Sequence, residues 1–470
     1  MIQGTTSDAG KSTLVAALGR YLARRGVSVA PFKPQNMTLS TSLTTDGGEI
    51  ARVTAMQAAA CRVTPHTDMN PILLKPRSDR GSDVIVRGHL QRHMAARDYQ
   101  QFKLQALDAA VAAWEALRRR HDVVLVEGAG SPAEINLRAG DLANMGFAER
   151  VDCPVWLVAD IDRGGVFAHL TGTLALLSAS EQARVSGLVI NRFRGDPALL
   201  QSGVDWLQQY SGKPVTGVLP YLHGLILEPE DSLGHCPTPT TEQAVRVVVP
   251  SLPRMAQHAD LEPLRRHPQV ALTLLRHADA WPGADLVLIP PSADPLGDAR
   301  WLADAGWRPQ LLRHLRYGGV LLGLGQGFAL LGEQLSDSHG RTEAGLGLLA
   351  LRSRLQAPQP QPAAAYWGGQ AVAATDFGDV QCQGAALARP LLAGTSGAAA
   401  GAISDDGQVF GSALHGVLGQ PAVLAQLLSR CGVAAQRVDH AARQETSLER
   451  LADWIDEHLD TAALMRTLRG

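Results

Sequence analysis

Apolar runs of strand type alternate with amphipathic stretches of helical type along the first half of the chain. Leu14, Leu18 and Leu22 lie on one face of such a stretch, which ends at Gly26, a glycine of the C-terminal capping type. The runs that predict buried strands are Val27–Phe32, Asp122–Val126, Pro154–Ala159, Gly187–Asn191 and Val215–Leu219. This alternation is typical of a parallel sheet covered by helices, so we predict an α/β domain over residues 1–235.

The second half repeats the alternation after a proline- and threonine-rich stretch. Cys236–Gln243 has no periodicity, and we predict a linker over residues 236–244. Apolar residues at helical spacing predict a last helix around Ser447–Leu468, whereas closely spaced prolines over Gln356–Ala365 predict a surface loop. Further strands are predicted at Val245–Pro250, Val270–Leu275, Asp285–Pro290 and Gly319–Gly323. Because 470 residues exceed a single core, we predict a second α/β domain over residues 245–470.

Composition and charge exclude several classes of function. The formal net charge of −2 provides no basic surface for nucleic acid. The 5 cysteines are far apart and form no CxxC pair, which argues against a zinc site or a disulfide framework. No apolar run reaches membrane-spanning length, so we expect no membrane partner. Together these features favour a protein of the cytoplasm.

The chain opens with a phosphate-binding loop of the Walker A type. Its sequence is Gly-Thr-Thr-Ser-Asp-Ala-Gly-Lys-Ser-Thr, which is one residue longer between the two glycines than the common form. Glycines let backbone N–H groups point at phosphate oxygens, and the following helix adds its positive N-terminal end. We expect Lys11 to reach the β and γ phosphates and the Ser12 hydroxyl to ligate Mg²⁺. The predicted ATP-binding residues are Gly4, Asp8, Gly10, Lys11, Ser12 and Thr13.

Two carboxylates are candidates to complete a magnesium site with Ser12. Glu127 follows a buried strand, at the edge where α/β sheets place ligands, and a buried charge there requires a cation. Asp46 lies in Thr-Asp-Gly-Gly-Glu, which is also a common turn. Lys33, after the second strand, is a candidate to neutralise a transferred phosphoryl group. A further polar group at a strand end comprises Asp160, Asp162 and Arg163. For each of these last three residues, a salt bridge that only shapes a loop is the alternative.

A series of motifs covers the whole predicted first domain in order. They are Gln3–Ser12, Pro31–Met37, Asp46–Ile50, His66–Pro71, Val126–Arg138, Asn144–Gly146, Asp160–Phe167, Ile190–Gly195 and Gly217–Pro220. Together they resemble the cobyric acid synthase family. The resemblance implies a fold similar to dethiobiotin synthetase and amidation of peripheral carboxylates of adenosylcobyrinic acid a,c-diamide with ATP and glutamine. It also implies that Asn191 contacts the adenine and that residues 127–138 lie between nucleotide and corrinoid.

The implied mechanism gives the phosphate-binding residues a role. A carboxylate is a poor electrophile, so ATP converts it to an acyl phosphate, and ammonia then displaces phosphate. The loop, Lys11, Lys33 and Mg²⁺ would stabilise charge on the transferring phosphoryl group. This half of the chain needs no side-chain nucleophile.

The second half resembles a class I glutamine amidotransferase without its nucleophile. Val320–Gly332 has the outline of a nucleophile elbow, and Gly325 stands where these enzymes carry cysteine. Glutamine hydrolysis requires a thiolate, an oxyanion hole of N–H groups and a histidine base. His415 is similar to the family's base, but Pro291 replaces a glycine and has no N–H to donate. Tyr366–Gly369 also lacks a histidine that is usual in the family.

We therefore expect a retired glutaminase site in which His415 is vestigial. A relocated nucleophile at Cys382 or Cys431 would still lack the Pro291 donor. The predicted function is an ATP-dependent amide ligase for a corrinoid polycarboxylate, with nitrogen from free ammonia or a separate glutaminase instead of glutamine. One alternative is a catalytically inactive nucleotide- or corrinoid-binding paralogue. Another is a biotin- or cell-wall-type ligase, against which the motif over residues 126–138 weighs.

Overall fold

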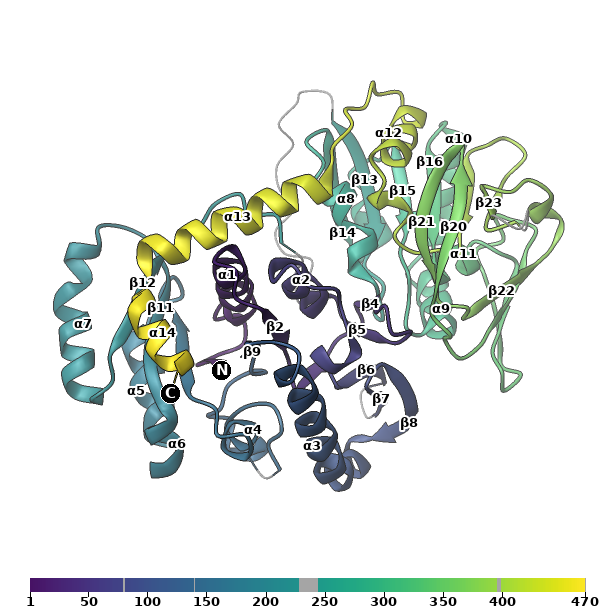
Figure 1. The fold of residues 1–470 in the computed structure, drawn as a ribbon. Coiled ribbons are helices and arrows are strands. Elements are labelled where there is room, and N and C mark those ends of the chain that lie inside the picture. The colour runs from purple at the N-terminus through teal and green to yellow at the C-terminus, as the bar shows by residue number, and fades with distance from the viewer. Residues whose placement is uncertain (79–80, 139, 228–243, 395–398, 470) are drawn as a thin grey trace. The chain divides into compact units, whose positions relative to one another are not determined.

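The computed structural model describes residues 1–78, 81–138, 140–227, 244–394 and 399–469 (Figure 1). They form two compact units, one comprising Met1–Glu230 with Ala441–Gly470 and the other Asp231–His440. Residues 236–243 of the predicted linker lie outside the described residues. Among the helices that the structure describes, none is both long and apolar enough to cross a membrane.

The first unit is built on a parallel layer of strands. β1 (Ile2–Gly4), β10 (Val155–Asp160), β11 (Val185–Phe193) and β12 (Val215–Pro220) pair in that order. β2 (Val29–Phe32) pairs in parallel with β9 (Val123–Val126). Glu127, directly after β9, bridges Ile2 in parallel and so joins the two ladders. The predicted parallel α/β domain is confirmed, and the carboxyl ends of its strands share one edge.

Helices and a smaller sheet complete this unit. The helices are α1 (Lys11–Arg24), α2 (Arg52–Ala60), α3 (Ala96–Arg118), α4 (Met145–Arg150), α5 (Val166–Leu176), α6 (Ala179–Arg184) and α7 (Pro197–Ser211). The smaller sheet has the order β3 (Gln35–Met37), β6 (Ile72–Ser78), β7 (Gly81–Val86) and β8 (His89–Ala95). A hairpin of β4 (Thr41–Leu43) and β5 (Glu49–Ala51) precedes α2.

The C-terminal helices belong to the first unit, which corrects the predicted extent of the second domain. α13 (His440–His458) and α14 (Thr461–Arg469) follow the second unit in sequence. Leu448, Leu451, Trp454 and Ile455 of α13 share one buried cluster with the apolar face of α1. The helical spacing was predicted correctly, but it does not reveal which partner covers the apolar face.

Ion pairs reinforce the contact between α1 and α13. Arg20 is only 1% exposed, and its guanidinium contacts the carboxylates of Glu445 and Glu449. Arg24 pairs with Asp453 at 2.6 Å on the same side of α1. A buried guanidinium is costly without partners, so Arg20 ties the correct docking of α13 to the stability of the first unit.

The second unit contains a mostly parallel sheet of its own. Its order is β14 (Val270–Leu275), β13 (Val245–Pro250), β15 (Leu286–Ile289), β16 (Val320–Leu324), β25 (Val409–Ser412) and β24 (Ala402–Ile403), of which β24 is antiparallel. Its helices are α8 (Glu262–Arg265), α9 (Pro295–Asp304), α10 (Trp307–Arg316), α11 (Gln326–Leu330) and α12 (Pro421–Arg430). The second predicted α/β alternation is thus confirmed.

Two small antiparallel or mixed sheets flank this one. They are β18 (Thr342–Ala344), β17 (Gln334–Ser336), β19 (Arg352–Leu355) and β22 (Val380–Gln383), and β21 (Gln370–Asp376), β20 (Gln361–Trp367) and β23 (Leu392–Gly394). The loop predicted over Gln356–Ala365 is wrong from Gln361 onward. At Pro362, β20 pairs only with β21, because pairing with β23 begins at Ala365, and an edge position tolerates proline.

The role of α13 can be tested with a single cavity-forming substitution. Leu451 is fully buried, so Leu451→Ala should destabilise the first unit by about 2–5 kcal/mol. Hydrogen exchange should then accelerate in α1 and not in β13 to β16. The exposed Leu199→Ala is the matched control, because Leu199 is 83% exposed. Unchanged protection of α1 in Leu451→Ala would contradict this assignment.

Candidate nucleotide site and glutaminase-like elbow

The phosphate-binding loop lies between β1 and α1. Gly10 has φ +98°, and a Cβ atom there would lie 2.0 Å from Nδ2 of Asn191, so this position requires glycine. Asn191, in β11, donates from Nδ2 to the Ala9 carbonyl oxygen at 2.9 Å. The structure therefore places Asn191 against the loop backbone. Its contact with adenine stays a prediction.

Lys11 points back into its own loop. Its Nζ donates to the carbonyl oxygens of Thr6 at 3.2 Å and Gly130 at 3.1 Å. Gly4 allows this position, because a Cβ atom there would come within 3.0 Å of the Lys11 Nζ. Both acceptors are neutral, so a phosphate oxygen would bind the ammonium group more strongly.

Glu127 is the centre of a buried polar cluster at the end of β9. Its Oε1 accepts from Ser12 Oγ at 2.7 Å and from Lys33 Nζ at 2.9 Å. Gln57, on α2, donates from Nε2 to the Glu127 Oε2 atom. Glu127 and Lys33 are both 0% exposed. The expectation that a buried Glu127 requires a cation is thus met by Lys33 within the chain itself.

The donor atoms at this cluster suit a magnesium ion. A serine hydroxyl and a carboxylate are hard oxygen ligands, and Ser12 and Glu127 are in direct contact. Over the residues that the structure describes, no group of three or more His, Cys, Asp or Glu side chains suited to a metal occurs. Mg²⁺ would therefore take its other ligands from phosphate and water, as it does in many nucleotide sites.

Asp46 belongs to a different network. Its carboxylate accepts from the Thr67 backbone N–H at 3.2 Å and from Thr67 Oγ1 at 2.5 Å, and it lies 3.5 Å from His66 Nε2. Burial raises the pKa of Asp46, but hydrogen bonds from Thr67 and Thr44 outweigh burial and lower it overall. The structure joins the Asp46 and His66 motifs, and a role of Asp46 in a metal site stays a prediction.

The acidic and basic residues at the ends of β10 and β11 form ion pairs that tie loops together. Arg163 pairs with Asp8 of the phosphate-binding loop at 2.5 Å, and Arg192 pairs with Asp160 at 2.8 Å. Arg194 similarly pairs with Asp162 at 2.7 Å. The loop-shaping alternative therefore describes these residues.

Thr13, the last of the predicted ATP-binding residues of the loop, lies in the first turn of α1.

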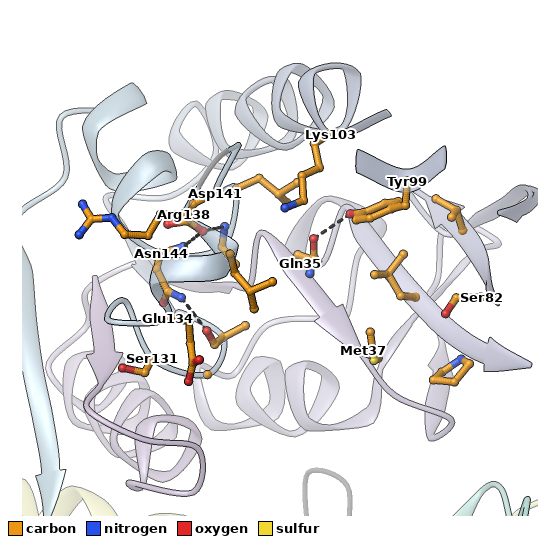
Figure 2. Close-up of a pocket in the computed structure, with 18 of the residues that line it drawn as sticks. Gln35, Met37, Ser82, Tyr99, Lys103, Ser131, Glu134, Arg138, Asp141 and Asn144 are labelled. Carbon is orange, nitrogen blue, oxygen red and sulfur yellow. Dashed lines mark hydrogen bonds between the residues drawn. The ribbon is translucent and has the colours of Figure 1, made fainter. Parts of the chain in front are cut away.

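A cavity of about 530 Å³ adjoins the phosphate-binding loop (Figure 2). Its mostly apolar walls come from β3, β6, β7, β8, α3 and the segment 129–144. Tyr99 donates to Gln35 Oε1 at 2.7 Å on one side, and burial raises the pKa of this tyrosine. Gly130 lines the cavity and also accepts from Lys11. Gly130, which lies outside the phosphate-binding loop, thus connects Lys11 of that loop to the wall of the cavity.

The second unit contains the predicted elbow in the turn from β16 to α11. Gly325 has φ +55° and ψ −124°, the kind of sharp strand-to-helix turn on which a nucleophile is displayed. A Cβ atom at Gly325 would lie 2.3 Å from Cε1 and 2.6 Å from Nε2 of His415. The structure therefore brings the two predicted residues together, with the histidine ring against the position of a missing side chain.

His415 is held by a carboxylate that the sequence did not reveal. Its Nδ1 lies 2.7 Å from Asp260 Oδ2, and Asp260 Oδ1 accepts the Gly416 N–H at 2.7 Å. The Nε2 atom of His415 is buried and has no hydrogen-bond partner among the described residues. A base and its orienting carboxylate thus survive where the elbow supplies no nucleophile.

The charges around His415 favour its protonated form. Burial lowers the pKa of His415, but the negative charges of Asp260, Asp379 and Asp376 outweigh burial and raise it above the ordinary value. The ring of Phe377 packs edge-on against the imidazole of His415, and the centroids of the two rings are 4.9 Å apart.

In the loop at Pro291 and Ser292, which the family resemblance makes the expected oxyanion donor, the polar groups bond to other parts of the chain. Pro291 offers only its carbonyl oxygen, which accepts from Ala256 N–H at 2.8 Å. The next N–H, of Ser292, donates to the side chain of Gln326 at 3.2 Å. Ser292 Oγ donates to Asp298, and burial raises the pKa of Asp298 to about 6.

The two cysteines considered as substitutes are unsuited to attack. Burial raises the pKa of the Cys431 thiol to about 12 and also raises that of Cys382. Cys382 Sγ lies 3.3 Å from Ser353 Oγ. Both thiols stay protonated at neutral pH and are poor nucleophiles.

Comparisons with known proteins assign both halves to domain families. Residues 1–233 match the CbiA family, described as a CobQ/CobB/MinD/ParA nucleotide binding domain. Residues 246–423 match the GATase_3 family, described as a CobB/CobQ-like glutamine amidotransferase domain. The chain joins a CobQ/CobB-type nucleotide-binding domain to a CobB/CobQ-like amidotransferase domain.

Solved structures match parts of this chain at low similarity. A glutamine amidotransferase is 16% identical with a TM-score of 0.33, over 40% of this chain and 99% of its own. The MinD cell division protein of Aquifex aeolicus is 13% identical with a TM-score of 0.27, over 47% of this chain and 81% of its own. Likenesses at this level carry no information on ligand or activity.

Several residues of both domains escaped the sequence analysis. Gln57, Tyr99 and Lys103 are ordinary helical positions in the sequence, and only the fold brings them to the cluster or the cavity. Asp260 precedes His415 by 155 positions, so no local spacing connects them. Gln35, by contrast, lies in the Pro31–Met37 motif, which marked its neighbourhood without assigning its role.

Restoring a thiol alone should not restore the amidotransferase reaction. Gly325→Cys should leave glutamine hydrolysis at background, because the His415 ring occupies the space of the new Cβ and Pro291 still donates no N–H. Glutamate release measures the activity, and Gly325→Ala separates steric effects from those of the thiol. Rapid glutamine turnover by Gly325→Cys would show that the site is intact apart from its nucleophile.

The charge on His415 should make the stability of the amidotransferase domain depend on pH. Folding raises the pKa of His415, so its protonated form stabilises the folded state below the ordinary value of 6.5. This contribution disappears as the pH rises through the raised value. The stability difference between wild type and His415→Gln, measured by urea unfolding, should therefore be larger at about pH 5.5 than at about pH 9. The exposed His339→Gln serves as control, and a difference that grows with pH would contradict the assignment.

Proposed function

We propose that the chain is a cobyric acid synthase-type amide ligase that uses ATP and takes ammonia from solution or from a separate glutaminase. The observation that carries the proposal is the shared backbone at Gly130. This residue contacts Lys11 at 3.1 Å and also lines the cavity. A carboxylate presented there would meet a phosphate held by the loop, which is the arrangement that acyl phosphate formation requires.

A corrinoid polycarboxylate suits the cavity as substrate. Leu74, Val84, Met94 and Leu142 supply apolar walls for the edge of a large hydrophobic macrocycle. Lys103, from α3, places a cation at the same cavity, where it can attract peripheral carboxylates. A cavity of about 530 Å³ accommodates one edge of such a molecule. The motifs shared with cobyric acid synthases support this choice of substrate class.

The residues of the nucleotide-binding domain have distinct roles in the proposed reaction. Lys11 exchanges its carbonyl partners for phosphate oxygens, and Ser12 with Glu127 would hold Mg²⁺. The ion, when bound, offsets the charge that develops on the transferred phosphoryl group. Lys33 pairs with the Glu127 carboxylate and holds it in place. The substrate carboxylate then attacks phosphorus, and ammonia displaces phosphate from the acyl phosphate.

The amidotransferase domain supports an external source of nitrogen. The elbow has no nucleophile, because Gly325 has no side chain. Pro291 has no N–H to donate to an oxyanion, and the N–H of Ser292 is bonded to the side chain of Gln326. The His415–Asp260 pair therefore has no nucleophile to activate for attack on glutamine. The described cysteines Cys61, Cys153, Cys382 and Cys431 are free, which suits the cytoplasm as the proposed setting.

One observation favours a catalytically inactive, nucleotide- or corrinoid-binding paralogue as the second candidate. Lys33 neutralises Glu127, and Lys11 bonds to loop carbonyls, so the cluster is satisfied with nothing bound. Such a cluster can persist without selection for catalysis. The two candidates differ in ATP turnover.

The decisive assay supplies corrinoid a,c-diamide, ATP and Mg²⁺ with either ammonium or glutamine. We expect ADP formation and amide formation with ammonium and little of either with glutamine. Glu127→Gln should lower the ammonium-dependent rate by about 100-fold or more, because it removes a carboxylate at the proposed metal. The exposed Glu115→Gln should match wild type.

Two results would change the conclusion. Efficient use of glutamine by the purified chain would contradict the external nitrogen source. Absence of ATP turnover with any corrinoid would favour the inactive paralogue.

A further inference from the structure

Gln57 is a fully buried polar residue at the centre of the nucleotide-binding domain. It is 0% exposed, and its Nε2 donates to Glu127 Oε2 and to the Ser12 carbonyl oxygen, the latter at 3.2 Å. Both partners are acceptors, so the nitrogen of the carboxamide must face them. This assignment leaves Oε1 buried without a hydrogen-bond partner among the described residues.

An unpartnered buried carbonyl lowers stability, so Gln57 is a poor choice for packing alone. Methionine or leucine would fill a similar volume and would carry no buried carbonyl of its own to satisfy. The cost is understandable only if the contacts of Nε2 serve another purpose. Those contacts join the end of β9, through Glu127, to the first turn of α1, through Ser12.

The three donors to Glu127 divide its two carboxylate oxygens. Ser12 and Lys33 both bond to Oε1, whereas Gln57 bonds to Oε2. The hydrogen bonds from Ser12 and Lys33 hold only one oxygen of the carboxylate directly. A third donor on the other oxygen fixes the plane of the group, and so fixes the direction in which it offers lone pairs.

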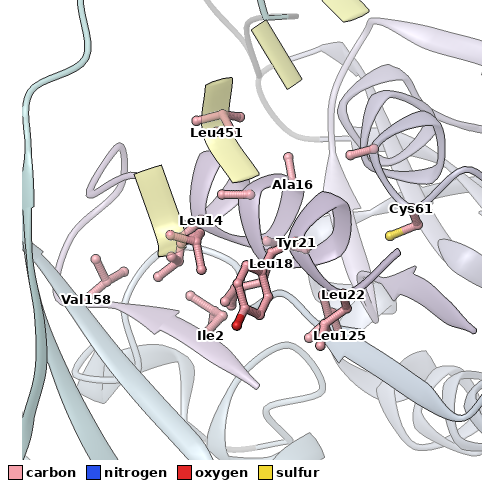
Figure 3. Packing of buried hydrophobic residues seen from close by; sticks show 14 of the residues in the cluster. Ile2, Leu14, Ala16, Leu18, Tyr21, Leu22, Cys61, Leu125, Val158 and Leu451 are labelled. Carbon is pink, nitrogen blue, oxygen red and sulfur yellow. The ribbon is translucent and has the colours of Figure 1, made fainter. Parts of the chain in front are cut away.

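The helix that carries Gln57 is held rigidly against α1. A Cβ atom at Gly19 of α1 would lie 2.5 Å from Cys61 Sγ, so the two helices approach closely at their ends. Arg20 donates to the carbonyl oxygens of Ala59 and Ala60 at 2.9 Å and 2.8 Å. Figure 3 shows Cys61 beside the packed face of α1, with Leu451 of α13 on another side. The carboxamide therefore has a fixed support.

We propose that Gln57 is a positioning residue that orients the Glu127 carboxylate for the magnesium–nucleotide complex. It acts through Glu127 and Ser12, and its removal weakens binding of Mg·ATP without weakening binding of metal-free ATP. The inference rests on the proposed function only in requiring that the loop binds ATP with Mg²⁺.

The test compares two variants on the same helix. Gln57→Met removes the donor and the unpartnered carbonyl together. Thr54→Val is the matched control, because Thr54 is also 0% exposed and its Oγ1 also has no partner among the described residues. Thr54→Val should keep the thermal unfolding temperature, whereas Gln57→Met should lower it modestly, because it removes the hydrogen bond to the buried Glu127 carboxylate. Only Gln57→Met should raise the dissociation constant of a fluorescent ATP analogue with Mg²⁺, by about tenfold or more.

A parallel titration in EDTA separates positioning from general damage. Equal affinity of Gln57→Met and wild type for the metal-free analogue supports the proposal. Equal weakening with and without Mg²⁺, or wild-type affinity in both conditions, would overturn it. A wild-type chain that binds Mg·ATP but amidates no corrinoid would refute the proposed function, and the ratio of dissociation constants would still decide the role of Gln57.

Discussion

The buried ion pair between Lys33 and Glu127 connects the elements on which the nucleotide-binding domain depends. Both side chains are 0% exposed, and the pair links the end of β2 to the end of β9. Ser12 and Gln57 extend it to α1 and α2. Loss of either charge would break this buried ion pair, which is destabilising. The same carboxylate that organises the fold is therefore the one that we propose as a ligand of Mg²⁺.

The C-terminal helices make this arrangement depend on the far end of the chain. α13 covers the apolar face of α1, and Arg20 of α1 is paired with Glu445 and Glu449 of α13. The amidotransferase domain is thus inserted in sequence between two parts of the nucleotide-binding unit. On the proposed function, in which the glutaminase chemistry is lost, the chain would still have to span this insertion before its first unit is complete. That constraint is one physical reason for the domain to persist without its nucleophile.

Much of this was accessible from the sequence, and the limits have physical causes. Strands and the elbow at Gly325 follow from periodicity and glycine spacing, which are local properties. The pairing of Gly325 with His415 was implied by family resemblance, and the structure brings the two residues together. The sequence predicts that Lys33 faces a phosphoryl group, which stays a prediction. It did not reveal the ion pair of Lys33 with Glu127, because an ion pair across two strands leaves no local signature. Asp260, Gln57 and the placement of α13 depend on contacts between distant segments, which no motif records.

Transfer of oxygen from substrate to phosphate tests the central claim most directly. The substrate would be a corrinoid a,c-diamide with ¹⁸O in its peripheral carboxylates, supplied with Mg·ATP and ammonium. Attack of the carboxylate on phosphorus, followed by displacement by ammonia, predicts that each amide formed releases inorganic phosphate with a single ¹⁸O atom. Amide formation with unlabelled phosphate would contradict an acyl phosphate intermediate and the ligase mechanism built on it.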